Sequence, residues 1–310
     1  MSYESNMLAK LRMPSRSEVE KNLLIILVEH NGTIKEFGTG EEIVTKIADT
    51  FNLNTEQRKS YLETIYRKEN RLKKSNLWHR LLFRAADNLA KRELITRPTK
   101  TYQLTNKKEW MLTEAGYNKA LALLNIPKEQ KNKLFIKSFE VEEVAKKIRV
   151  TEKPQKYIPF SSNSNKKQTT RLMNIRSRGF RQAIIEAYDF KCAICGLKIY
   201  SPNKYQWEVE AAHIIPHSKN GKDDIWNGLS LCRFHHWAFD VGWYGIDPEL
   251  RIVTSRFVHN LPNDMGKQWN YDLINYPTNK NIKLFLPSDK SQWPDFLALQ
   301  WHMENILQKG

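Results

Sequence analysis

The placement of the cysteines constrains the fold of this chain more than any other feature. Among 310 residues there are only three cysteines, and all three fall in two short ligand pairs with the spacings C-x2-C and C-x2-H. The pairs consist of Cys192, Cys195, Cys232 and His235. Tight turns that each offer two thiolate or imidazole ligands suit a tetrahedral Zn²⁺ ion. An odd number of cysteines argues against a disulfide framework, so we predict a structural zinc site, with ordinary buried cysteines as the alternative.

The charge of the chain indicates a polyanionic partner. Lys and Arg total 50 against 34 Asp and Glu, which gives a formal net charge of +16. Such a balance favours nucleic acid, although an acidic membrane surface would fit the charge alone. Residues 1–20 are polar, and no run of about twenty apolar residues occurs, so we expect no membrane association and a cytoplasmic location. The length predicts two domains and a linker.

The amino-terminal part has the pattern of a helical domain. Residues 1–18 lack periodicity and are expected to form a flexible arm. An apolar run predicts a buried helix over 19–30, and a second helix is expected to follow Gly40. A basic, polar helix is predicted around 55–68, and leucines at helical spacing predict another over 76–92.

Two strand-like runs follow, over 94–96 and 101–105, and a further helix is expected to open near Thr113. Helices followed by a small basic hairpin are the order of a winged helix, in which the basic helix enters the DNA major groove and the hairpin touches phosphates. We therefore expect a winged-helix DNA-binding domain over 19–124 and a basic linker over 125–167. The expected DNA contacts of this domain are Arg80, Arg84, Arg97 and Lys100. A merely solvated basic surface is the alternative.

The segment 19–124 also resembles the Mrr amino-terminal winged-helix family of restriction proteins. The resemblance depends on the helix order and on the endings Tyr102-Gln-Leu-Thr105 and Leu112-Thr-Glu-Ala-Gly116. It implies a DNA-binding role and contains no catalytic signature.

A second resemblance covers about residues 176–253. Between the two ligand pairs the chain reads Glu210-Ala-Ala-His213-Ile-Ile-Pro216, and the second pair runs into His235-His236-Trp-Ala-Phe-Asp240. These motifs resemble the HNH (ββα-metal) endonucleases, whose fold is a β-hairpin leading into a helix. The expected fold class is therefore α+β, with an amino-terminal winged helix and a zinc-stapled ββα-metal nuclease domain over 168–310 that includes a carboxy-terminal extension.

The HNH resemblance implies a role for each motif residue. His213 would be the general base, because an imidazole titrates near neutrality and can take a proton from the attacking water. Asn227 would tie the connecting loop and so orient the base. His236 and Asp240, four residues apart on a helix, would clamp one catalytic Mg²⁺ or Mn²⁺ ion.

Two points about the metal sites stay open in the sequence. His235 is assigned to zinc because its offset from Cys232 completes the pair, but the reverse assignment of His235 and His236 is an alternative. Many HNH enzymes carry Asp or His as a metal ligand immediately before the base, whereas this chain has Ala212. Glu210 lies on the same side of the strand and could reach in. Further expected phosphate contacts are Arg178 and Arg181.

These features predict a restriction-type endonuclease of prokaryotic or phage origin that hydrolyses double-stranded DNA, with modification-dependent cleavage as a close variant. One HNH site cuts one strand at a time, so we expect a homodimer. Two alternatives compete with this function. One is a zinc-containing winged-helix regulator without catalysis, and the other is a defence nuclease whose amino-terminal module senses a signal rather than DNA.

Overall fold

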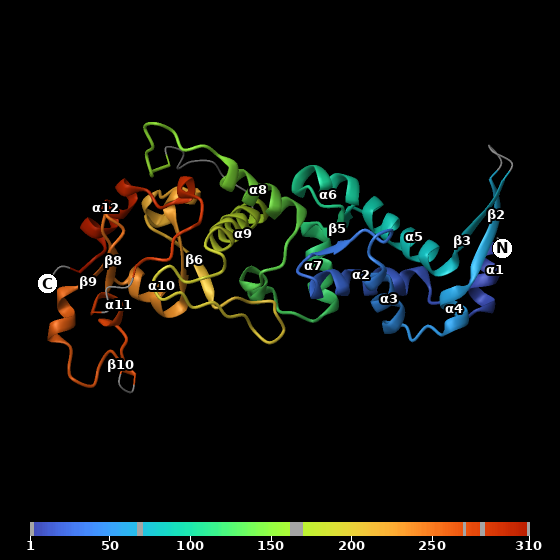
Figure 1. Ribbon diagram of the computed structural model, residues 1–310, viewed down its shortest axis with the longest axis horizontal. Helices are drawn as coiled ribbons and strands as arrows, with labels where there is room; N and C mark the ends of the chain where they lie inside the picture. The colour runs from blue at the N-terminus through green and yellow to red at the C-terminus, as the bar shows by residue number, and fades with distance from the viewer. Residues whose placement is uncertain (1–2, 67–70, 162–169, 269–270, 280–282, 309–310) are drawn as a thin grey trace. The chain divides into compact units, whose positions relative to one another are not determined.

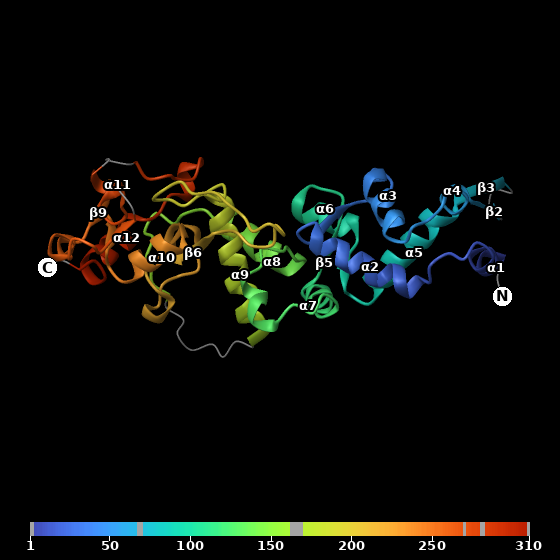
Figure 2. The same cartoon turned by 90° about the horizontal axis from the view of Figure 1, so that it is seen from below.

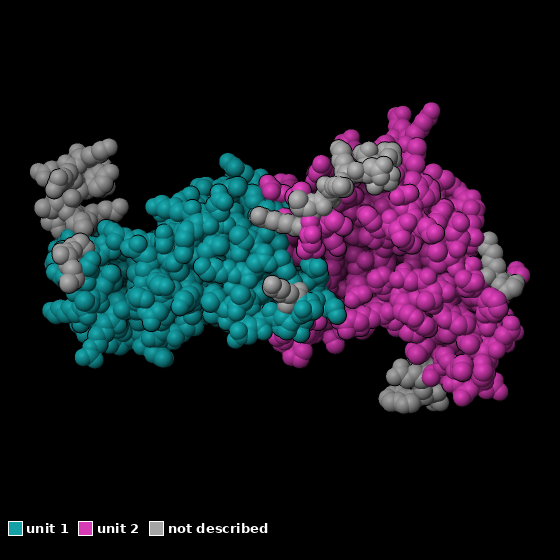
Figure 3. All heavy atoms as spheres, turned by 180° about the vertical axis from the view of Figure 1, so that it is seen from behind, with its two compact units in different colours: residues 1–140 teal, residues 141–310 magenta. Residues whose placement is uncertain are grey.

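The computed structural model describes residues 3–66, 71–161, 170–268, 271–279 and 283–308. It divides into two compact units, residues 1–140 and residues 141–310 (Figure 3). The boundary lies inside the segment expected to be a linker, and that expectation is wrong for α8 (Phe139–Val150). Val141, Ala145 and Ile148 are buried at helical spacing, so α8 has an apolar face that an irregular linker would leave in water.

Unit 1 is built around α2 (Arg16–Glu29), which confirms the first expected helix and starts three residues earlier. A capping box fixes this start: the Ser15 hydroxyl accepts from the Glu18 backbone N–H, and the Glu18 carboxylate accepts from the Ser15 N–H at 2.7 Å. Helix α2 packs against α5 (Leu77–Lys91) and α7 (Glu114–Leu123), and α3 (Glu41–Thr50) follows Gly40 as predicted.

A three-stranded antiparallel sheet completes this core, with the order β1 (Thr33–Lys35), β5 (Glu109–Leu112) and β4 (Ile95–Thr96). The strand expected at 101–105 is instead part of α6 (Pro98–Thr105), so the predicted hairpin is wrong. Pro98 supplies a preset helical φ at the first turn, and the Thr101 and Thr105 hydroxyls donate to carbonyls four residues earlier. The partner of β4 is therefore β5.

The helix expected around 55–68 is also mostly wrong. Only α4 (Thr55–Lys59) is helical, and the chain then forms β2 (Tyr61–Tyr66), which pairs along its whole length with β3 (Arg71–Asn76) (Figure 1). Aromatic and β-branched side chains in β2 favour a strand over a helix. The last part of the expected helix, residues 67–68, lies outside the described residues. The side chain of Asn76 then caps α5 by accepting from the His79 N–H at 3.0 Å, which confirms that helix.

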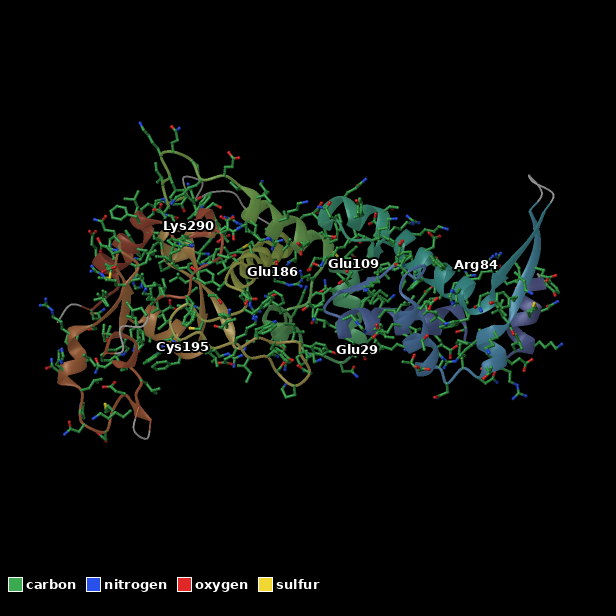
Figure 4. All side chains as sticks on the ribbon, in the orientation of Figure 1. Glu29, Arg84, Glu109, Glu186, Cys195 and Lys290 are labelled. Atoms are coloured by element: carbon green, nitrogen blue, oxygen red, sulfur yellow. The ribbon has the colours of Figure 1, made fainter. Side chains whose placement is uncertain are left out.

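The expected flexible arm contains a helix, α1 (Tyr3–Lys10). Its Glu4 is 7% exposed and forms ion pairs with two arginines of α5, with Arg80 Nε at 2.9 Å and an Arg84 terminal nitrogen at 2.6 Å. Figure 4 shows Arg84 projecting from α5. The buried carboxylate of Glu4 thus holds the arm against α5. In the sequence, Glu4 does not differ from the polar residues around it.

Unit 2 contains a hairpin followed directly by a helix. Strands β6 (Val209–His213) and β7 (Gly228–Cys232) pair antiparallel over five residues each, and α10 (Arg233–Asp240) begins at the next residue. Helix α9 (Thr170–Ala187) packs on both strands.

Helix α8 lies beside α9, as Figures 1 and 2 both show. The two helices approach closely at Gly179, where a Cβ atom would stand 2.4 Å from a Val144 methyl group. Unit 2 is thus a ββα core with α9 as its backing helix.

The carboxy-terminal extension packs on this core, as expected. Helix α12 (Phe296–Asn305) contacts β8 (Tyr244–Ile246), and its His302 ring stacks on Phe239 of α10 at 3.6 Å between centroids. The other elements are β9 (Ile252–Thr254), β10 (Lys267–Gln268), β11 (Tyr271–Asp272) and α11 (Tyr276–Asn279), with 3-10 turns at Lys128–Lys133, His217–Lys219, Ile225–Asn227, Arg256–Asn260 and Lys290–Gln292. Within the described ranges, no helix has the length and apolar character needed to cross a membrane.

Candidate active site and metal centre

The four predicted zinc ligands come together in unit 2. All the ligand atoms of Cys192, Cys195, Cys232 and His235 lie within 4.8 Å of one another. The Sγ atoms of Cys195 and Cys232 are 3.9 Å apart, and His235 Nδ1 lies 3.1 Å from Cys232 Sγ and 3.5 Å from Cys192 Sγ. Tetrahedral zinc with its usual bond lengths needs S–S separations of about 3.8 Å and S–N separations of about 3.6 Å. The cluster therefore fits a zinc ion.

The chemistry of this cluster agrees with its geometry. Hydrogen bonds from the Cys195 and Cys232 thiols, followed by one from His235, hold the pKa of Cys192 far below its ordinary value, although burial opposes the shift. A thiolate is the form of cysteine that binds metal. The cluster joins the turn at Cys192 to the junction of β7 and α10, and Cys195 is labelled in Figure 4. A metal here would hold α10 in place on the hairpin.

Asn227 ties the loop between β6 and β7, as its expected role requires. Its side-chain amide donates to the carbonyls of Ile215 at 3.1 Å and Lys222 at 2.9 Å, and its Oδ1 accepts from the Ile215 N–H at 2.9 Å. The side chain is fully buried. Gly221 lies against the same amide, where a Cβ atom would stand 1.8 Å from the Ile215 carbonyl oxygen. The loop thus closes tightly just beyond His213, at the end of β6.

His213 is held on two sides. Its Nε2 lies 2.7 Å from Asp223 Oδ1, and its ring stacks on Phe180 of α9 with centroids 4.1 Å apart and planes 10° apart. Asp223 also pairs with Arg176 of α9, whose Nε lies 2.6 Å from Oδ2. One ring nitrogen is therefore fixed by a carboxylate, and the ring is half-buried.

Asp223 is a charged residue in a buried place. Burial opposes its ionisation, but the hydrogen bond with His213 and the charge of Arg176 outweigh burial, so the pKa of Asp223 lies below its ordinary value. No role was predicted for Asp223 from the sequence. Asp223 lies in a loop ten residues after His213, so the sequence alone does not indicate that the two side chains meet. They meet because Asn227 holds that loop in its folded-back conformation.

His236 and Asp240 face one another on α10, with Nε2 and Oδ2 3.5 Å apart. The other ring nitrogen of His236, Nδ1, lies 3.0 Å from Glu210 Oε2 on β6. The hydrogen bond that His236 donates to the Glu210 carboxylate raises the pKa of His236, and burial only partly opposes the shift. For Asp240, burial raises the pKa and the nearby charges of His236 and His213 lower it, with a net rise. The two histidines thus divide as expected, with His235 at the cysteines and His236 at the carboxylates.

The expected DNA contacts of unit 1 are engaged with other side chains. Arg80 and Arg84 pair with Glu4. Arg97 pairs with Asp87 at 2.7 Å, and the Lys100 ammonium lies 4.4 Å from the centroid of the Phe139 ring. These cations would have to exchange partners in order to bind phosphate.

The two expected contacts in α9 differ from each other. Arg178 is 5% exposed, so it does not present its guanidinium to a phosphate backbone, and the expectation for this residue is not supported. The positive charge of Arg181 helps to lower the pKa of Glu210, after the hydrogen bond with His236. Arg181 therefore belongs to the surroundings of the site, whereas Arg178 belongs to the packing of α9.

Comparison with known proteins agrees with this geometry. Residues 192–247 match the family model described as HNH endonuclease. A solved structure titled "Modification dependent TagI restriction endonuclease" matches with a TM-score of 0.30 and 19% identity over 41% of this chain, and only 37% of that protein's length is covered. No curated protein matches the chain. The segment 192–247, which contains the zinc ligands, the β6–β7 hairpin and α10, is thus similar to the HNH endonucleases.

Proposed function

We propose that the protein is a restriction-type DNA endonuclease in which unit 1 selects double-stranded DNA and unit 2 cuts it with His213 as the general base. One observation carries the catalytic part of this proposal. A single hairpin-helix scaffold presents a histidine fixed by a buried carboxylate at the end of β6 and a His–Asp pair on α10. A regulator that only binds DNA has no use for this arrangement.

The proposed chemistry divides between the two histidines. Asp223 fixes one nitrogen of His213, so the other nitrogen can accept the proton of a water that attacks phosphorus. His236 and Asp240 would hold the catalytic ion, Mg²⁺ or Mn²⁺, and that ion would stabilise charge on the phosphate and the leaving 3′ oxygen. The 3.5 Å between His236 Nε2 and Asp240 Oδ2 is close to the separation of two ligands on one ion.

The proposal for unit 1 depends on topology. Helices α2, α3 and α5 combined with the sheet order β1-β5-β4 are compatible with a winged helix in which α6 interrupts the wing. The net charge of +16 supports a nucleic-acid partner. A homodimer, a preference for modified DNA and a prokaryotic or phage origin are parts of the same proposal. A homodimer would supply the second site that double-strand cleavage requires.

One observation favours the alternative of a signal-sensing amino-terminal module. Arg80 and Arg84, the two cations that α5 would present to DNA, are paired with the buried Glu4. In that case unit 2 is still a nuclease, and only the role of unit 1 changes.

The deciding experiment incubates the purified protein with methylated and unmethylated plasmids in Mg²⁺ or Mn²⁺. We expect the parent to cut, and His213→Ala to keep zinc content, thermal transition and DNA affinity while cleavage falls by at least about a hundredfold. His217→Ala is the matched control, because its ring lies 6.4 Å from that of His213. A parent that cuts no DNA under any of these conditions refutes the proposal, and an inactive His217→Ala beside an active His213→Ala moves the base to His217.

A further inference from the structure

The carboxylate beside His236 has no role in the function proposed so far. The residue immediately before His213 is Ala212, which offers no group that could bind a metal. Glu210 lies two residues earlier on the same face of β6. Its Oε2 lies 3.0 Å from His236 Nδ1, and its side chain is 37% exposed. Glu210 could therefore bind the proposed catalytic ion directly, or it could act on the metal site through His236.

The geometry around the imidazole decides between these two roles. Two ligands on one octahedral ion with bonds of about 2.1 Å lie about 3.0 Å apart, and somewhat farther apart when the angle opens. His236 Nε2 and Asp240 Oδ2, at 3.5 Å, are close to that separation. Glu210 contacts the other nitrogen, Nδ1, on a different edge of the ring.

The spacing of the possible ligand atoms points the same way. Glu210 Oε2 lies 3.0 Å from His236 Nδ1, whereas Asp240 Oδ2 lies 3.5 Å from His236 Nε2. The two carboxylates thus lie against different nitrogens of the same ring. Glu210 is placed to hold the ring of His236, and Asp240 is placed to share an ion with it.

We propose that Glu210 is a positioning residue that accepts the Nδ1–H of His236 and so leaves the Nε2 lone pair directed at the catalytic ion. Metal-binding histidines commonly donate their second N–H to a carboxylate, which fixes the tautomer and the ring orientation and makes the ligand more basic. Arg233, whose Nε lies 3.8 Å from Glu210 Oε1, helps to keep that carboxylate ionised. This inference rests on the proposed catalytic ion at His236 and Asp240.

The test measures metal affinity rather than cleavage. Zinc-loaded full-length protein is titrated with Mn²⁺ by calorimetry in the absence of DNA. Glu210→Ala should weaken Mn²⁺ binding by about 10- to 100-fold, the usual cost of losing such an outer carboxylate. Glu210→Gln keeps an oxygen that can accept the Nδ1–H and should fall between the parent and Glu210→Ala. Glu208→Ala is the matched control, because Glu208 pairs with Arg233 at 3.5 Å and should bind Mn²⁺ like the parent.

A second readout reports the tautomer itself. Long-range ¹H–¹⁵N spectra of ¹⁵N-histidine protein with Mg²⁺ should show His236 protonated at Nδ1 in the parent and in Glu210→Gln, and a mixture of tautomers in Glu210→Ala. Zinc content and thermal transition show that each variant is folded. Equal Mn²⁺ affinity in the parent and a folded Glu210→Ala overturns the positioning role alone. A parent that binds no Mn²⁺ beyond its zinc overturns the catalytic ion and this inference together.

Discussion

Replacing Asp223 with Asn tests whether His213, the proposed general base, depends on the buried carboxylate of Asp223. The change removes one oxygen and the charge, while the side chain keeps its size. Asp223 is 9% exposed, and its Oδ1 lies 2.7 Å from His213 Nε2, so a charge-assisted hydrogen bond in a dry place is lost. Such bonds contribute about 1.5–3 kcal/mol, which corresponds to about a tenfold to hundredfold loss of turnover. An amide N–H facing Nε2 would also move the ring proton to the nitrogen that must take it from water.

The assay is single-turnover plasmid cleavage at saturating metal. We expect kcat to fall for Asp223→Asn while DNA affinity and zinc content stay at parental values. Asp224→Asn is the control, since the Asp224 carboxylate contacts the Tyr157 hydroxyl at 2.8 and 2.9 Å instead of His213, and its turnover per folded molecule should match the parent. If Asp223→Asn cuts within twofold of the parent while His213→Ala is inactive, the carboxylate does not orient the base.

Three further predictions concern other parts of the chain. Cys232→Ser should lose zinc, and its unit 2 should unfold at a lower temperature, because four ligands and one ion hold this small core together. Elemental analysis that finds no zinc in the dialysed parent protein would contradict this prediction. If α5 binds DNA, Glu4→Gln should release Arg80 and Arg84, raise the affinity for DNA and make that affinity depend more steeply on salt. Unchanged binding at several salt concentrations would show that another surface binds DNA. Burial lowers the pKa of His302 to about 4, below its ordinary value, so its neutral form contributes stability above about pH 6.5 that is lost as the pH falls toward 4. The free energy of unfolding should fall by at most about 3 kcal/mol over this pH range. Urea unfolding measured at several pH values should show a smaller fall for His302→Phe than for the parent.

The sequence predicted which side chains of unit 2 lie together better than it predicted the architecture of unit 1. The zinc ligands and the division of His235 from His236 follow from short-range spacing, because neighbouring residues on a turn or helix have nearly fixed separations. The tie by Asn227 was expected from the HNH resemblance alone. Asp223 was given no role, since its meeting with His213 depends on a closed loop.

The errors in unit 1 have a different physical origin. In the segment 98–105, threonine and tyrosine favour a strand by propensity, but a proline at the first turn and hydroxyl bonds to the backbone produce α6. Residues 61–66 were assigned to a helix for their polarity, although full pairing with β3 decides their conformation. The burial of Glu4 could not be predicted from its neighbours in the sequence either. Glu4 pairs with Arg80 and Arg84, which lie more than seventy residues further along the chain. Pairing with another segment determines the conformation of residues 61–66 and the burial of Glu4, whereas α6 follows from local interactions that outweigh strand propensity.

The packing of α9 on the hairpin has a consequence for protein engineering. The family match begins at Cys192, yet the ring that stacks on His213 and the arginine that pairs with Asp223 both belong to α9, which ends at Ala187. A nuclease cassette that starts at the edge of the recognisable motif would contain every proposed metal ligand, but it would lack the helix that packs against the proposed base, His213. A chimaera that joins this catalytic module to another DNA reader should therefore take its splice point before α8, so that the α8–α9 pair travels with the hairpin.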